Sequence, residues 1–150
     1  MRFLDRIFKL ETISGAGICP VYLHRWTLLR LGRWCKVYLH HFSANDWSVD
    51  YHNHPKRFTV FGLWGGYTEH VYNPVTRKVR RQRFRAPWVR TFPPSHAHRI
   101  VMEEYEHAWT LVVIGPTRQE WGFYRTDRAG IWIPWRRYVY GPHGAARKDC

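Results

Sequence analysis

The sequence predicts an all-β domain, built as a closed or two-sheet β-barrel. Aromatic residues make up 17% of the 150-residue chain, and they suit the pleated surfaces of strands better than helices. Short stretches rich in β-branched and aromatic residues recur at near-regular spacing, with Gly, Pro and Asn turns between them. No convincing long helix interrupts this pattern. One β domain therefore accounts for the chain, without an internal repeat or a second core.

The two ends of the chain are expected to lie outside the barrel. Residues 1–20 are predicted to be an arm and linker, because residues 3–10 could form a short amphipathic helix or an ordered arm and residues 12–20 are rich in Ser, Gly and Pro. The barrel is expected over residues 21–140. Residues 141–150 are predicted to form a basic, flexible tail.

Turn residues divide the barrel region into predicted strands. Gly65-Gly66 would allow a tight turn or a bulge between two of them. Asn73-Pro74 indicates the turn of a long hairpin, and Gly115-Pro116 ends a strand. The strands are expected at residues 21–31, 36–43, 58–64, 67–71, 78–85, 95–101, 108–114, 120–124 and 131–140.

The chain carries a formal net charge of +13, which predicts a positive field that attracts polyanions and charged small ligands. Nucleic acid is one candidate partner, and a solubilising role for the charge is equally compatible with the composition. In the basic stretch 77–85, Arg81, Arg83 and Arg85 share one strand face. That row could bind phosphates, with aromatic side chains nearby for stacking on bases. The alternative is a solvated edge strand whose charge prevents aggregation.

The cellular location is predicted to be the cytoplasm. The odd number of three cysteines, without close spacing, argues against a disulfide framework. The first residues lack the apolar core and cleavage site of a signal peptide, and no apolar run is long enough to span a bilayer. A membrane partner is therefore not expected.

Histidine pairs supply the strongest local signal. His52 and His54 are separated by one residue, so on a strand both imidazoles project from one face, roughly 7 Å apart. From that spacing both can turn toward one small ion. A second pair, His96 and His98, follows a proline loop. His40 has the strand parity of core residues, and together with His96 it is a candidate ligand-binding residue.

Two segments resemble the motifs of the cupins, which carry an HxH pair followed by a carboxylate and a glycine, and later a proline-containing segment that ends in a third histidine. His52-Asn53-His54 with Gly65-Gly66 resembles the first motif, and Pro93-Pro94-Ser95-His96-Ala97-His98 resembles the second. Other segments, such as Leu63-Trp64-Gly65-Gly66-Tyr67-Thr68-Glu69 and Trp121-Gly122-Phe123, look like a group of small single-domain cupins of bacteria and their phages without assigned activity. The resemblance covers about residues 21–140. It implies the jelly-roll double-stranded β-helix of that fold, which hosts many chemistries.

The resemblance also implies a metal site. His52, His54 and His98 would converge around an open coordination position that suits divalent Fe, Mn, Ni, Cu or Zn. One departure is that the carboxylate expected shortly after the HxH pair is absent, near Thr59. Glu69 could replace it as the fourth ligand or act as a general base, beside Tyr67 on the same strand face. Otherwise the site is reduced to three histidines. His96 would be the alternative ligand if the register differed by one pleat.

Three functions are compatible with these features. The first is a metal-dependent enzyme, of the oxygenase or isomerase type, acting on a small anionic metabolite or nucleotide. The second is a binding module that captures a nucleotide or nucleic acid through the basic hairpin, which in a phage-type protein could serve host takeover or counter-defence. The third is a structural accessory protein that retains histidines from an ancestor. Because cupins often pair through their sheets, a homodimer is also expected.

Overall fold

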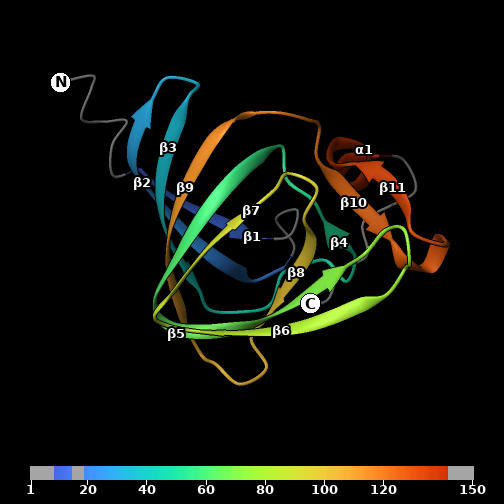
Figure 1. The fold of residues 1–150 in the computed structure, drawn as a ribbon, viewed down its shortest axis with the longest axis horizontal. Helices are drawn as coiled ribbons and strands as arrows, with labels where there is room; N and C mark the ends of the chain where they lie inside the picture. Colours follow the sequence, from blue (N-terminus) through green and yellow to red (C-terminus); the bar gives the residue numbers. More distant parts are fainter. Residues whose placement is uncertain (1–8, 15–18, 142–150) are drawn as a thin grey trace.

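The computed structural model describes residues 9–14 and 19–141, and they form an all-β barrel of two facing layers (Figure 1). The predicted fold class is therefore confirmed. The strands are β1 (Leu10–Ser14), β2 (Val21–Leu31), β3 (Cys35–Phe42), β4 (Tyr51–His52), β5 (Lys56–Tyr72), β6 (Val79–Arg85), β7 (Trp88–Phe92), β8 (Ala97–Val101), β9 (Ala108–Thr117), β10 (Gly122–Arg125) and β11 (Ile131–Pro134). A short 3-10 turn (Thr126–Arg128) and the helix α1 (Trp135–Tyr140) complete the described part.

Strand β5 belongs to both layers. Its first half pairs with β9 and β7, and its second half pairs with β6 and β8. The order of the strands is β1-β2-β3-β9-β5-β8-β4-β10-β11, with β6 and β7 also bound to β5. All of these pairings are antiparallel. One long strand therefore joins the two layers and fixes how they face each other.

Glycines allow β5 to change layers without ending. Of the tight turn or bulge expected at Gly65-Gly66, the turn is not formed, because the strand continues through both residues. A bulge or irregularity in the register lies just before them, between Gly62 and Trp64. Gly65 adopts a φ of +71°, a conformation that side chains disfavour. Gly62 allows the indole of Trp88 to lie close to the backbone of β5, because a side chain at position 62 would collide with that indole.

The predicted hairpin at Asn73-Pro74 is confirmed. Strands β5 and β6 pair from Tyr72 opposite Val79 onward. The Asn73 Oδ1 accepts hydrogen bonds from the backbone N–H groups of Val75 and Thr76. Such side-chain bonds to the backbone favour Asn in turns.

The N-terminal boundary of the barrel was predicted wrongly. Strand β1 pairs with β2, so the sheet begins at Leu10 and not at residue 21. The Ser, Gly and Pro content of residues 12–20 hid this short strand, which is held by an ion pair of 2.8 Å between Glu11 and the Arg25 Nη2. The helix or arm expected before Lys9 and the tail expected after Gly141 lie outside the described residues.

The C-terminal segment also differs from the prediction. The strand expected over residues 131–140 ends at Pro134, and α1 follows at once, with its Tyr138 fully buried.

Cys19 takes part in a disulfide bond, whereas Cys35 is free. The disulfide bond corrects the expectation, drawn from the odd number of cysteines, that disulfide bonds are absent. No helix within the described ranges is long and apolar enough to cross a membrane.

A buried polar network holds α1 against the loop before β4. The Tyr138 hydroxyl donates to the Asp50 Oδ2 at 2.8 Å and lies 2.8 Å from the Ser48 hydroxyl. The other Asp50 oxygen accepts from the backbone N–H and the hydroxyl of Thr126. Asp50 and Tyr138 have no exposed surface. A buried carboxylate requires such partners, so this network fixes the chain just before His52.

Replacing Tyr138 with Phe removes one donor from this network. We expect Tyr138→Phe to lower the free energy of unfolding by about 1–3 kcal/mol, because the buried Asp50 loses a hydrogen bond. Chemical denaturation measures the change. The control is Tyr140→Phe, since Tyr140 is 74% exposed, and it should stay within about 0.5 kcal/mol of the wild type. Equal, negligible changes in both variants would contradict the role of the network.

Candidate metal centre

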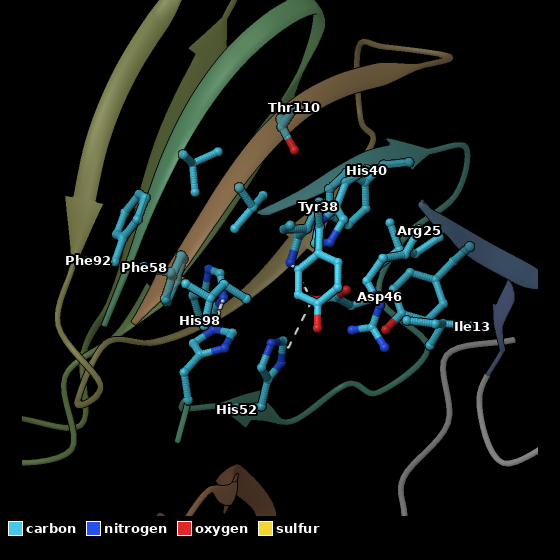
Figure 2. A pocket seen from close by; sticks show the side chains of 18 of the residues that line it. Ile13, Arg25, Tyr38, His40, Asp46, His52, Phe58, Phe92, His98 and Thr110 are labelled. Carbon is cyan, nitrogen blue, oxygen red and sulfur yellow. Dashed lines mark hydrogen bonds and ion pairs between the residues drawn. The ribbon is translucent and has the colours of Figure 1, made fainter. Parts of the chain in front are cut away.

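The barrel encloses a cavity of about 570 Å³ between its two layers. Most of its wall is apolar and aromatic, and histidines and two carboxylates interrupt this wall (Figure 2). A volume of this size is typical of sites for small organic molecules. The predicted residues His40, His52, His54, Tyr67, Glu69 and His98 all line it.

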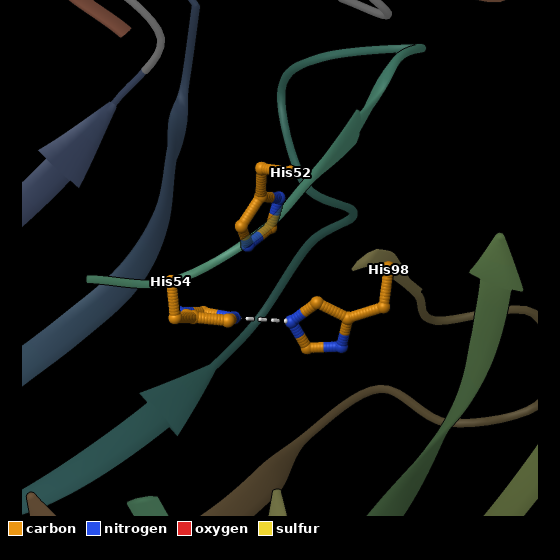
Figure 3. Close-up of side chains that lie close together, drawn as sticks. All are labelled: His52, His54 and His98. Atoms are coloured by element: carbon orange, nitrogen blue, oxygen red, sulfur yellow. Dashed lines mark hydrogen bonds between the residues drawn. The ribbon is translucent and has the colours of Figure 1, made fainter. Parts of the chain in front are cut away.

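Three of the predicted histidines converge at one side of this cavity (Figure 3). One ring nitrogen from each of His52, His54 and His98 lies within 4.8 Å of the others. The Nε2 atoms of His54 and His98 are 2.8 Å apart. Without an ion, one of these two nitrogens must carry a proton. A cation could instead be bound by both.

Local backbone contacts hold the three histidines in place. Strand β4 pairs with β8 so that His52 lies opposite His98. Asn53 points away from the cavity and accepts a hydrogen bond from the Gly122 N–H at 2.8 Å. The His54 N–H donates to the Pro94 carbonyl, which ties the first histidine pair to the loop before the second. His52 and His54 therefore both face the cavity and Asn53 does not, as the spacing of the HxH pair predicted.

Glu69 contacts the side of the His98 ring that is turned away from His54. Its Oε1 accepts a hydrogen bond from the Nδ1 of His98, while the Nε2 of His98 faces His54. The residues are diagonal neighbours on β5 and β8, a spacing at which side chains on one face interact. Glu69 thus contacts the nitrogen of His98 that is turned away from His54, and its role as a fourth ligand of the triad or as a general base stays a prediction. A carboxylate in this place orients a ligating histidine and fixes its tautomer.

His96 also lies behind the triad. Its Nε2 is 3.1 Å from the Glu69 Oε1, and it does not line the cavity. Glu69, His96 and His98 form a second set of atoms that could hold a metal, using the other nitrogen of His98. The two sets share one residue. We assign the first set as the metal site because all three of its members line the cavity.

Asp46 is a site residue that the sequence analysis missed. It is 4% exposed, lines the cavity, and its Oδ2 lies 3.8 Å from the His52 Nδ1. The same oxygen accepts from the backbone N–H of Ile100 at 2.8 Å. In the sequence Asp46 belongs to a turn, and no signal there shows that its carboxylate reaches another strand. Together, Asp46 and Glu69 provide carboxylates behind two of the three histidines.

Burial and neighbouring charges set the protonation of the site. Burial, and then the proximity of His98, holds the pKa values of His52 and His54 well below the usual range. The pKa of His98 is raised, because the charge and hydrogen bond of Glu69 outweigh burial. Burial followed by the charge of Glu69 raises the pKa of Tyr67 well above its usual value. His52 and His54 are therefore neutral at pH 7, the form that binds metal ions.

The predicted arginine row lies on the outer surface of the barrel. Arg81 and Arg83 are on β6, where they form ion pairs with Glu103 at 3.6 Å and Glu104 at 2.6 Å. Arg85 follows on the same exposed strand. None of the three lines the cavity. The proposed binding of nucleic acid by this row stays a prediction, and so do the homodimer and the cytoplasmic location.

The donor set fits a divalent transition metal. Three imidazoles converge, two of them are neutral, and the third has its other nitrogen held by a carboxylate. This combination is typical of protein sites for Fe, Mn, Ni, Cu or Zn, and imidazoles alone do not select among them. The cavity leaves room for a substrate beside the ion.

Comparisons with known proteins agree with the fold. No family model matches the sequence, and a search of curated proteins gives no significant match. A cupin 2 conserved barrel domain protein from Rhodopseudomonas palustris is similar in structure, with a TM-score of 0.60, 13% identity and 79% of each chain covered. The polyketide cyclase RemF from Streptomyces resistomycificus is similar with a TM-score of 0.56 and 14% identity, and 82% of each chain is covered. HppE in its Fe(II) form gives 0.56 and 11%, over 71% of this chain and 56% of that one.

The similarity to the cupin 2 barrel protein shows that the chain has the cupin fold, as the resemblance implied.

Removing the charge of Glu69 tests its role behind His98. We expect Glu69→Gln to weaken binding of Zn²⁺ by roughly 10–100-fold, because the amide no longer fixes the ring of His98 as a carboxylate does. A competition titration with a chromogenic chelator measures the affinity. Glu104→Gln, on the outer surface, is the matched control and should bind as the wild type does. Unchanged affinity in Glu69→Gln would contradict the assignment.

Proposed function

We propose that this protein is a metal-dependent enzyme, of the oxygenase or isomerase type, that acts on a small anionic metabolite. The observation that carries the proposal is the convergence of His52, His54 and His98 on one side of an apolar cavity of about 570 Å³. A structural accessory protein would not require two neutral histidines and a third that is held by a carboxylate at the wall of a cavity. Similarity in fold to HppE in its Fe(II) form and to a polyketide cyclase supports the proposal.

The chain's own residues provide the conditions for such chemistry. A divalent transition metal bound to the triad would supply Lewis-acid or redox chemistry to a substrate in the cavity. Glu69 holds His98 through a hydrogen bond, and the carboxyl group of Asp46 lies 3.8 Å from the Nδ1 of His52. The apolar wall excludes water and strengthens electrostatic interactions with the substrate. Tyr67, with its raised pKa, keeps its proton and can donate a hydrogen bond.

Basic residues along the cavity support an anionic substrate. Lys36 and Lys56 line the cavity, and so does Arg25, whose charge is paired with that of Glu11. Burial, followed by the charges of Arg30 and Arg25, lowers the pKa of Lys36. An anion beside Lys36 would relieve this repulsion between like charges. The net charge of +13 would draw such a substrate toward the protein.

Metal content tests the proposal directly. Protein purified without chelators should contain about one transition-metal ion per chain, as measured by inductively coupled plasma mass spectrometry. His52→Ala and His98→Ala should lose most of it, because two remaining imidazoles bind an ion weakly. The control is His70→Ala, since His70 lies outside the cavity lining and next to Glu103. Equal metal content in the triad variants and the control would refute the proposal.

A further inference from the structure

The wall that faces the metal site carries a second polar feature, formed by His40 and Thr110. His40 is on β3 and Thr110 on β9, directly opposite each other in the register. Both line the cavity, as Figure 2 shows above the histidines of the metal site. Directly opposed residues of an antiparallel pair have their Cβ atoms about 4.5–5.5 Å apart. One atom of a bound molecule can therefore contact both side chains.

Both side chains have polar atoms that the described protein leaves unsatisfied. The Nε2 of His40 and the Oγ1 of Thr110 are buried, and no described residue forms a hydrogen bond with either atom. Thr110 is 2% exposed. Buried polar groups in proteins nearly always have a partner. Among the buried atoms without one in the described residues, these two belong to directly opposed residues of the cavity wall. An oxygen atom placed between them would satisfy both.

The charges around His40 indicate which kind of oxygen fits. Burial, assisted by the charge of Arg25, lowers the pKa of His40 to about 3, so its ring is neutral at pH 7. Arg25 lies opposite His40 on β2, and its guanidinium binds Glu11 through both Nε and Nη2, at 2.9 and 2.8 Å. The positive charge of Arg25 is thus already paired with the negative charge of Glu11. A carbonyl or hydroxyl oxygen fits here better than a carboxylate or a phosphate.

The remaining wall near this pair suits an apolar, planar body. Tyr38 and Phe42 flank His40 along β3, with ring centroids 5.9 and 5.8 Å from its own. Val60 and Val112 line the same cavity from β5 and β9. Flat aromatic walls favour flat ligands through stacking and apolar contact.

We propose that His40 and Thr110 form a subsite that binds a carbonyl or hydroxyl oxygen of the substrate, whose body is apolar and planar. This inference rests on the proposed function in one respect, namely that the cavity is the substrate site. The substrate would extend from the metal site across the cavity to the facing wall. An anionic group of the same molecule would lie near Lys36, away from the His40–Thr110 pair.

A matched pair of probes tests the subsite without the metal. 2-Acetylnaphthalene and 2-isopropenylnaphthalene have the same skeleton, and a carbonyl oxygen in the first replaces a methylene group in the second. Equilibrium dialysis against protein freed of metal with a chelator measures both affinities. We expect the ketone to bind about tenfold more tightly, because only its oxygen can form hydrogen bonds with the pair.

Variants of His40 and Thr110 test whether these two side chains cause the preference for the ketone. Thr110→Val keeps the shape of the side chain and His40→Phe keeps a ring, so each should bind the alkene as the wild type does and reduce the preference for the ketone severalfold. Thr91→Val, at an exposed position outside the cavity lining, is the control and should keep the preference. Since the assay excludes metal, loss of metal binding would refute the proposed function and leave this result standing. The subsite is refuted if neither probe binds, if the two probes bind equally, or if the preference persists in both pair variants.

Discussion

The continuity of β5 is the constraint on which the rest of the structure depends. Its 17 residues run through both layers, so its first half shapes one wall of the cavity and its second half carries Tyr67 and Glu69 to the other. Gly62 and Gly65 make this possible, one by admitting Trp88 and the other by its left-handed backbone. A turn at this point would uncouple the two walls. The spacing between the metal site and the facing wall therefore follows from a single strand.

The site itself depends on how buried charge is compensated. A carboxylate 1% exposed, such as Glu69, is costly unless charged or hydrogen-bonding groups surround it. His98 and His96 meet that requirement at Oε1, whereas the other oxygen, Oε2, is buried without a hydrogen-bond partner among the described residues. The contacts of His98 and His96 hold the pKa of Glu69 below its usual value against the effect of burial. The same contacts keep the Nε2 of His98 directed at His54. The contact between Glu69 and His98 thus compensates a buried charge and also sets the orientation of the His98 ring.

Periodicity and turn residues in the sequence predicted much of the architecture. Each prediction that was wrong or missing has an identifiable physical cause. Alternation placed His52, His54 and His40 on inner faces because the side-chain period of a strand is two. The role of Glu69 depends on the diagonal pairing of β5 with β8, which no local pattern encodes. Asp46 was missed for the same reason, since its partner Ile100 is 54 residues away. Strand β1 was missed because the composition of a short edge segment resembles that of a linker.

The central claim is that one metal ion lies between the ring nitrogens of His52, His54 and His98. The most direct measurement is the anomalous diffraction of crystals grown with Co²⁺, recorded on both sides of the cobalt absorption edge. We predict one strong anomalous peak within about 2.0–2.3 Å of a nitrogen of each histidine. A peak between Glu69, His96 and the Nδ1 of His98, or no peak inside the barrel, would contradict this account.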